Sequence, residues 1–168
     1  GFVSLGREKG MGKREDKTNV MRILDLNKIE YTPYSYSPEL TEGTLIAEAL
    51  GEEPPRVFKT LVTVAASGLH YVFVIPVAET LDLKAAARCV GEKSVAMLKQ
   101  KELLPLTGYI HGGCSPIGMK KPFKTLIDSS AKKFEKIFVS AGRVGRQIET
   151  SPLSIAELSG ADFADITV

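Results

Sequence analysis

The chain has 168 residues, of which 43% are hydrophobic and 25% are charged, which is ordinary for one soluble globular domain. No apolar run approaches the roughly 18 residues that a membrane span requires, and the first residues lack the apolar stretch of a signal peptide. The two cysteines, Cys89 and Cys114, cannot form a disulfide framework, so we expect a cytoplasmic, reducing setting.

The net charge of +2 is unevenly distributed. Residues 120–146 contain eight basic and two acidic side chains, a local charge of +6, so the rest of the chain is acidic. Such a segment favours a polyanionic partner such as RNA, although a solvated lysine-rich surface is the ordinary alternative. The candidate RNA-binding residues are Lys120, Lys121, Arg143 and Arg146.

The first third of the chain predicts a lead, a helix, a strand and a second helix. Residues 1–16 are rich in glycine and charge without an apolar period, so we expect a disordered lead before a domain at 17–168. Thr18 is a plausible cap for a helix to about Lys28, and Tyr31–Tyr36 alternates as a strand does. Thr41 and Gly51 are expected to bound a helix whose inward face contains Leu45, Ile46, Ala49 and Leu50.

The stretch from Val57 to Ala66 is β-branched and apolar, which predicts a strand buried on both faces. Lys59 is the exception within it. An ammonium group is costly to bury without a partner, so its head must reach solvent or contact an anion in a cleft. A strand-end lysine that reaches solvent and a pocket lysine that awaits a ligand both remain open on spacing alone.

Ser67-Gly68 predicts a turn, and His70–Ala78 a second strand that pairs with the first as a hairpin. Asp82 should cap a helix that ends at Gly91 and buries Leu83, Ala86, Ala87 and Val90. Helices and strands then mix without regular alternation, which favours an α+β fold over a doubly wound sheet. The later expected elements are a strand and helix within 94–104, an irregular stretch at 107–122, strands at 124–128, 137–140 and 147–150, and helices at 129–134 and 151–159.

The glycine-rich loop Gly112–Gly118 lacks the lysine and hydroxyl residue that end a phosphate-binding P-loop. Its backbone N–H groups can still be presented to an oxyanion or a carbonyl, or the loop is a structural turn. A metal site would need more ligands than His111 and Cys114 with the distant His70 and Cys89. A Cys114–His111 nucleophile pair lacks an evident orienting group, and Cys114 as a small packed residue is the plainer interpretation.

Four ordered motifs resemble one family. They are Val57-Phe58-Lys59-Thr60-Leu61, Leu81-Asp82-Leu83-Lys84, Thr107-Gly108-Tyr109 with Gly112–Gly118, and Val139-Ser140-Ala141-Gly142-Arg143 with Gln147-Ile148-Glu149. The chain is similar to the YbaK/EbsC family of aminoacyl-tRNA deacylases, which is related to the editing domain of bacterial prolyl-tRNA synthetases. The similarity covers about Lys17 to Ile166.

This resemblance implies a single α+β domain with a mixed, barrel-like β-sheet and flanking helices. It also implies clearance of mischarged tRNA(Pro), typically Cys-tRNA(Pro), in trans and alongside prolyl-tRNA synthetase, with no metal or other cofactor. In this family the cysteinyl thiol is thought to attack its own carbonyl. The implied catalytic residues are Lys59 and Thr60, and the implied substrate-binding residues are Tyr36, Gly112, Gly113, Cys114, Ser115, Gly118, Ser140, Gly142 and Gln147.

The sequence departs from the family pattern at Glu42, where an aromatic residue can occur, at Gln147, where some members have Asp, and at Cys114, where an aliphatic residue is commoner. The first two changes leave the amino-acid specificity open. The alternatives are a deacylase for another small amino acid, such as Ala-tRNA(Pro), and a tRNA- or synthetase-binding module without activity. A cell-surface role is disfavoured by the lack of an export signal.

Overall fold

The computed structural model describes residues 6–7, 16–40 and 42–168. Its α-helices are α1 (Asn19–Leu26), α2 (Gly43–Leu50), α3 (Leu83–Val90), α4 (Gln100–Thr107) and α5 (Pro152–Ser159), with short 3-10 helices η2 (Pro54–Arg56) and η3 (Ser129–Lys133). The strands are β1 (Gly6–Arg7), β2 (Thr32–Ser35), β3 (Phe58–Ala65), β4 (His70–Pro76), β5 (Val95–Met97), β6 (Lys124–Asp128), β7 (Ile137–Ser140), β8 (Arg146–Thr150) and β9 (Asp162–Ala164).

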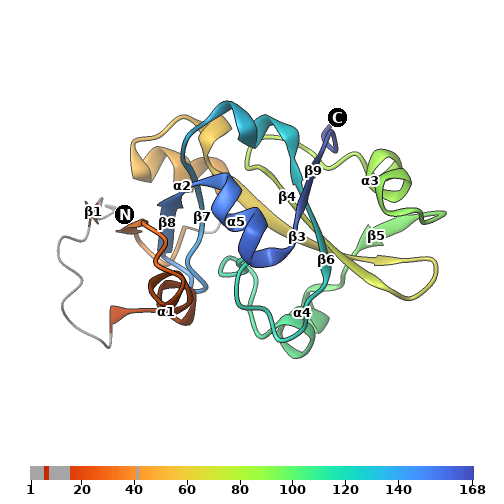
Figure 1. The fold of residues 1–168 in the computed structure, drawn as a ribbon, viewed down its shortest axis with the longest axis horizontal. Helices are drawn as coiled ribbons and strands as arrows, with labels where there is room; N and C mark the ends of the chain where they lie inside the picture. Colours follow the sequence, from red (N-terminus) through yellow and green to blue (C-terminus); the bar gives the residue numbers. More distant parts are fainter. Residues whose placement is uncertain (1–5, 8–15, 41) are drawn as a thin grey trace.

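These strands form two sheets, which confirms the mixed α+β fold. The first has the order β1-β2-β8-β7 and the second β5-β3-β4-β6-β9 (Figure 1). In the second sheet β3 and β4 are antiparallel, whereas β6 pairs in parallel with both β4 and β9. A parallel bridge between Val57 and Phe138 joins the sheets. Within the described residues the sheets do not close into a barrel.

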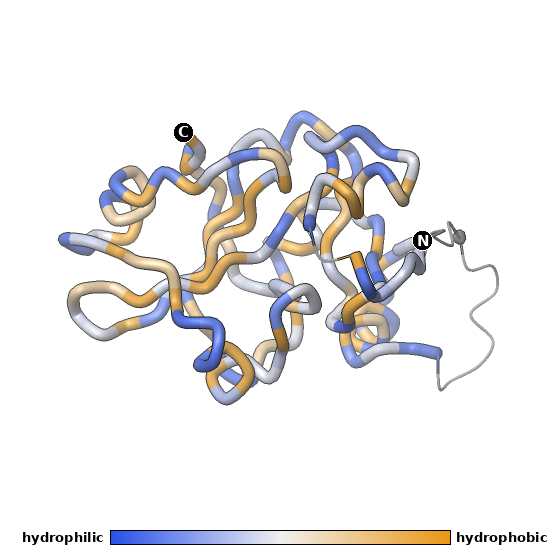
Figure 2. The backbone as a smooth tube through the Cα atoms, turned by 180° about the vertical axis from the view of Figure 1, so that it is seen from behind, coloured by the Kyte–Doolittle hydropathy of each residue, from blue (hydrophilic) through white to orange (hydrophobic). Residues whose placement is uncertain are grey.

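The expected hairpin is present, with Val64 opposite His70 and Lys59 opposite Ile75. Its strands are apolar because they contribute to two separate parts of the core. Val62, Val72 and Val74 pack with α1 residues, whereas Phe73 and Ile75 pack with α3 residues. Figure 2 shows this pattern as hydrophobic central strands with more hydrophilic turns around them. Strand β3 therefore runs through the centre of the molecule and places Lys59 there.

The helix caps follow the sequence closely. Thr18 Oγ1 accepts from Met21 N at 3.2 Å, and Asp82 Oδ1 accepts from the backbone N–H groups of Lys84 and Ala85 at 3.1 Å each. Gly51 and Gly91 end α2 and α3 with φ of 70° and 73°, a left-handed conformation that glycine adopts without steric cost. The expected cap Thr41 lies outside the described residues, and Glu42 occupies the N-cap position of α2.

Several expectations were wrong. Leu45 and Leu83 are 42% and 41% exposed, because α2 and α3 bury alanines at Ala47 and Ala85 instead. The strand β9 was not predicted either, nor was the pairing of Gly6–Arg7 with β2. In the described part of the chain no helix is long and apolar enough to cross a membrane.

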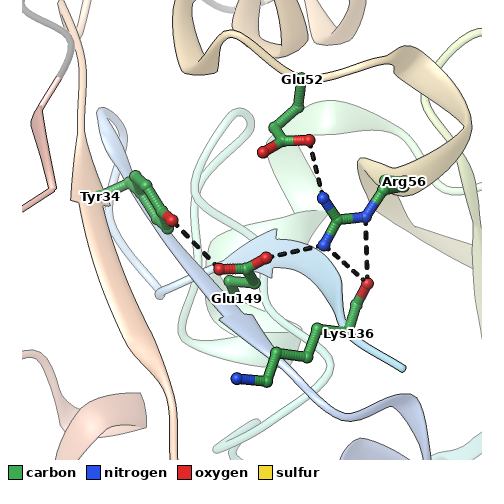
Figure 3. A network of polar contacts seen from close by, with 5 residues as sticks. All are labelled: Tyr34, Glu52, Arg56, Lys136 and Glu149. Atoms are coloured by element: carbon green, nitrogen blue, oxygen red, sulfur yellow. Dashed lines mark hydrogen bonds and ion pairs between the residues drawn. The ribbon is translucent and has the colours of Figure 1, made fainter. Parts of the chain in front are cut away.

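Arg56, at the entrance to β3, links the two sheets through a polar network (Figure 3). Its guanidinium donates to Glu149 of β8 at 2.7 Å and to Glu52 at 2.8 Å, and also to the backbone carbonyl of Lys136. Tyr34 of β2 donates to the other oxygen of Glu149 at 3.1 Å. Since Lys59 follows Arg56 by three residues, this network fixes where β3 begins relative to the first sheet.

Candidate active site and basic cleft

A cavity of about 150 Å³ lies beside β3, where the two sheets meet. It gathers residues that are far apart in the sequence. Lys59 and Thr60 come from β3, Gly112 and Cys114 from the glycine-rich loop, Ser140 from the end of β7 and Gln147 from β8. We call this cavity the Lys59 pocket. Six of the residues that the sequence nominates for catalysis or substrate binding therefore line one pocket.

Lys59 is partly buried at the pocket wall. Burial lowers the pKa of its ammonium group, and the negative charge of Glu79 opposes this shift. No ion pair of Lys59 occurs among the described residues. The structure thus favours a lysine that faces a cleft over one whose head extends freely into solvent. A cation in a partly desolvated pocket interacts more strongly with a developing negative charge than it would in water.

Two buried oxygen atoms of the pocket residues have no hydrogen-bond partner among the described residues. They are Thr60 Oγ1 and Gln147 Oε1. Gln147 is 5% exposed, and its Nε2 donates to the Tyr36 hydroxyl at 3.4 Å. Tyr36 does not line the pocket but lies behind Gln147, with its backbone N–H donating to Gly145 O. A buried polar atom without a partner costs about 1–3 kcal/mol, so a ligand that supplied the hydrogen bonds would recover that free energy.

The glycine-rich loop is held by close packing. A Cβ atom on Gly113 would lie 3.0 Å from Val144 N and 3.1 Å from Arg143 C, so any other residue would force this backbone apart by a few tenths of an ångström. Ser115 is fully buried outside the pocket, and its Oγ accepts from Ile117 N at 3.3 Å. Ser140 Oγ accepts from Gly142 N at 3.1 Å. Ser115 and Gly113 therefore shape the loop, whereas Gly112 and Cys114 border the pocket.

Cys114 and His111 both line the pocket. Burial raises the pKa of the Cys114 thiol to about 12, so the thiolate is scarce near neutral pH. A nucleophilic cysteine requires the opposite shift. The structure therefore disfavours the Cys114–His111 nucleophile pair and supports Cys114 as a packed wall residue. In the described part of the chain, no group of three His, Cys, Asp or Glu side chains is arranged to hold a metal ion.

Sequence reasoning missed several pocket residues. Gly43 and Ile46 of α2, Val77 after β4, and Leu103 of α4 all border the cavity. Gly43 lies against Val77, since a Cβ atom there would lie 2.5 Å from the Val77 Cβ. A glycine just after a helix N-cap was a signal for such close packing, but nothing in the sequence showed which segment approached it. Glu42 is not a lining residue, and its Oε1 accepts from Thr44 Oγ1.

The remaining nominated residues lie elsewhere. Gly118, Gly142, Lys120 and Arg143 line a second hollow of about 320 Å³, which we call the basic cleft. Lys121 is exposed outside it, and Arg146 donates to the backbone carbonyl of Asp16 at 2.8 Å.

The basic segment 120–146 is divided over the surface. Lys132, Lys133 and Lys136 border a different, open depression with Pro152 and Leu153. The cationic side chains of segment 120–146 therefore do not all border one hollow.

The fold and the pocket define an α+β domain that can hold a small polar ligand beside a lysine. Comparison with known proteins identifies the class. The family model for the aminoacyl-tRNA editing domain matches residues 41–158. The chain is 46% identical over 157 residues to the "Putative Cys-tRNA(Pro)/Cys-tRNA(Cys) deacylase EbsC" of Enterococcus faecalis, covering 92% of this chain and 96% of that protein. The chain belongs to the aminoacyl-tRNA editing domain family.

Other similarities agree with the fold. The uncharacterized protein YwhH of Bacillus subtilis is 28% identical over 67% of this chain and 71% of its own length. The crystal structure of "a putative trans-editing enzyme for prolyl tRNA synthetase" matches 89% of this chain and 96% of its own, at 24% identity and a TM-score of 0.77. That of the hypothetical protein APE2540 covers 90% of this chain and all of its own, at 23% identity and a TM-score of 0.83.

Proposed function

We propose that this protein is a trans-acting deacylase that removes a wrongly attached amino acid from tRNA, with Cys-tRNA(Pro) as its main substrate. The observation that carries the proposal is the Lys59 pocket, where a partly desolvated cation shares a small cavity with Thr60 and Gln147, each of which has a buried oxygen without a partner among the described residues. The name of the Enterococcus faecalis relative supports the same substrate. We further propose that the protein acts in the cytoplasm, alongside prolyl-tRNA synthetase.

The size of the pocket suits a small amino acid. The volume of about 150 Å³ is small beside the roughly 300–1,000 Å³ of typical ligand pockets. A cysteinyl or alanyl group fits within such a space. The apolar walls formed by Ile46, Val57 and Val77 favour a short, weakly polar side chain over a charged one.

The unpartnered oxygens suit the polar atoms of an aminoacyl ester. Gln147 Oε1 can accept a hydrogen bond from the substrate's α-ammonium group, while the Tyr36 hydroxyl holds the other end of the amide. The hydroxyl of Thr60 can donate to the acyl carbonyl. Lys59 then lies on a wall from which its ammonium group can stabilise the negative charge that develops on that carbonyl oxygen.

The chemistry proceeds with the substrate's own thiol as the nucleophile. The thiol sulfur bonds to the acyl carbon, the bond from that carbon to the ribose oxygen breaks, and the thiol proton passes to the ribose oxygen. The products are tRNA with a free hydroxyl and a cyclic thioester, which water opens. The protein confines the cysteinyl group and stabilises the oxyanion, so it needs no general base of its own.

The test is single-turnover deacylation of cysteinyl-tRNA and alanyl-tRNA, both carried on proline tRNA, by the wild type and Lys59→Ala. We expect rapid loss of the cysteinyl ester with the wild type and at least about a hundredfold slower loss with the variant, as for other transition-state stabilisers. Preference for the alanyl ester would overturn Cys-tRNA(Pro) as the main substrate and would favour a deacylase for Ala-tRNA(Pro). Wild-type inactivity on both esters, with retained tRNA binding, would overturn the enzyme proposal in favour of a binding module.

A further inference from the structure

The basic cleft is separate from the Lys59 pocket and brings together positive charge from three segments. Arg22 comes from α1, Lys120 follows the glycine-rich loop, and Arg143 lies in the turn between β7 and β8. No carboxylate lines the cleft among the residues that the structure describes. Arg22 belongs to the acidic remainder of the sequence, so the charge pattern of residues 120–146 gave no indication of it.

These cations are available to a ligand. None of the three forms an ion pair within the described residues, and the sole side-chain hydrogen bond among them is a long one, from Lys120 Nζ to Pro105 O at 3.5 Å. Asp25, the acidic residue of α1, is already paired with Lys17 at 2.6 Å. The three positive charges are therefore not neutralised by neighbours, and an anion between them would be attracted by all three.

The basic cleft, of about 320 Å³, has three glycines in its walls. Gly108, Gly118 and Gly142 all border it, with φ of 86°, 80° and 95°. A Cβ atom on Gly118 would lie 2.8 Å from the hydroxyl of Tyr109, and one on Gly142 would lie 3.1 Å from the Tyr109 ring. Gly118 and Gly142 thus pack on Tyr109 as a floor, and the charged side chains border the same hollow.

The basic cleft adjoins the Lys59 pocket along two segments of the chain. Ser140 lines the pocket, and Ala141, Gly142 and Arg143 line the cleft. In the glycine-rich loop Cys114 lines the pocket and Gly118 the cleft. The Cα atoms of Ser140 and Gly142 are at most about 7.6 Å apart, since successive Cα atoms are separated by about 3.8 Å. An RNA strand whose terminal ester occupied the pocket would therefore have its nearest phosphates within reach of the cleft.

We propose that the basic cleft binds backbone phosphate of the single-stranded 3′ end of the RNA substrate, with Arg22, Lys120 and Arg143 as the phosphate ligands. The proposal rests on the proposed function, because it takes the aminoacyl ester to lie in the Lys59 pocket. It excludes Lys121 and Arg146 from this contact, since neither lines the cleft.

The test compares two variants of the full chain with equal loss of charge. The cleft variant is Arg22→Gln/Lys120→Gln/Arg143→Gln, and the control is Lys84→Gln/Arg88→Gln/Lys93→Gln around α3, at the opposite end of the molecule from α1 (Figure 1). The first readout is binding of an uncharged RNA hairpin with a single-stranded 3′ end, measured across salt concentrations. The second is turnover of 3′-cysteinyl-adenosine, which has the ester but no backbone phosphate.

We expect the cleft variant to bind the hairpin at least about tenfold more weakly than the control. The slope of its log affinity against log salt concentration should be smaller by about 0.7 for each phosphate that the variant no longer binds. Its turnover of 3′-cysteinyl-adenosine should equal that of the wild type. The charge-conserving Arg22→Lys/Arg143→Lys variant should bind nearly as well as the wild type.

Equal hairpin binding by the cleft and control variants would overturn the proposal. The proposal would also be overturned if the cleft variant lost turnover of 3′-cysteinyl-adenosine to the same extent as it lost hairpin binding. The three residues would then act through the Lys59 pocket. If the wild type cleaves no ester but the cleft variant alone loses hairpin binding, the proposed deacylase function fails and the cleft stands as an RNA site. The two failures are thus distinguishable.

Discussion

The side-chain amide of Gln147, on β8, donates at 3.4 Å to the hydroxyl of Tyr36, which directly follows the paired strand β2. The amide nitrogen is the end bonded to Tyr36, and Gln147 Oε1 has no partner among the described residues, so the acceptor end of the amide is left for a ligand.

Tyr36→Phe should therefore weaken substrate binding without unfolding the protein. A neutral hydrogen bond contributes about 1 kcal/mol, so we expect a KM for the cysteinyl ester that is higher by about fivefold, with a smaller change in kcat. Steady-state kinetics check this. Tyr31→Phe is the control, since Tyr31 contacts Asp25 of α1 and does not line the pocket. Unchanged kinetics in Tyr36→Phe would show that the amide needs no anchor.

Glu79→Gln should shift the pH dependence of deacylation. The Glu79 carboxylate raises the pKa of Lys59 against the effect of burial, so its removal lowers that pKa further. If the protonated lysine stabilises the oxyanion, the alkaline limb of the pH–rate profile must move to lower pH. The measurement is single-turnover rate against pH, corrected for spontaneous ester hydrolysis. A gain in activity at lower pH would instead indicate that neutral Lys59 acts as a base.

Lys59→Met should raise the free energy of unfolding while it abolishes activity. In the folded protein the pKa of Lys59 lies below 10.5, the ordinary value that it takes in the unfolded chain. At a pH between these two pKa values, the unfolded chain therefore binds more protons than the folded protein does. The free energy of unfolding of the wild type therefore increases as the pH rises through this window. Below the window, where Lys59 is charged in both states, Lys59 destabilises the folded protein most. The advantage of Lys59→Met, measured by urea unfolding, should be largest near neutral pH and shrink as the pH approaches the ordinary lysine pKa. A variant less stable than the wild type at neutral pH contradicts this account.

Arg56→Ala should destabilise the fold by about 2–4 kcal/mol, because it leaves the Glu149 carboxylate, whose side chain is 11% exposed, without its cation. Glu149→Gln in the same background should restore part of the loss, and a double-mutant cycle by chemical denaturation measures this coupling. Lys17→Ala removes a more exposed ion pair and should cost less than about 1 kcal/mol. Additive losses for Arg56 and Glu149 would show that the network does not couple the sheets.

Cys114→Ala should retain deacylation. Burial holds the Cys114 thiol protonated near neutral pH, with a pKa of about 12, whereas Cys89 is exposed. Iodoacetamide at neutral pH should therefore label Cys89 and spare Cys114 in the folded protein, as mass spectrometry of digested peptides would reveal. Loss of activity on alkylation of Cys89→Ser protein would reinstate Cys114 as a reactive group.

Local signals predicted most of the secondary structure. Thr18, Asp82 and Ser151 cap helices as expected, and Gly51 and Gly91 end them, because caps depend on residues within one turn. The inward faces were less predictable. Leu45 and Leu83 are exposed because α2 and α3 pack closely through alanines instead. Which face of a helix is buried depends on the surface that it packs against, and the hydrophobic periodicity of the sequence does not contain that information.

The site was predicted only in part for a similar reason. Motif resemblance identified Lys59, Thr60, Cys114, Ser140 and Gln147, which the fold brings to one pocket. The motifs could not show that Gly118 and Gly142 face a different hollow, because one or two residues along a loop suffice to change sides. Arg22 lay outside every motif, and only the packing of α1 against the glycine-rich loop brings it beside Arg143.

The backbone contact between Gly113 and Val144 bears on how homologous sequences should be compared. Any side chain at position 113 would press on main-chain atoms of the β7–β8 turn, which yield less readily than a flexible side chain does. Selection should therefore retain glycine there even in relatives that have lost activity. Its invariance in an alignment would record steric exclusion, and degeneration of the site would first become visible at Lys59 and Gln147.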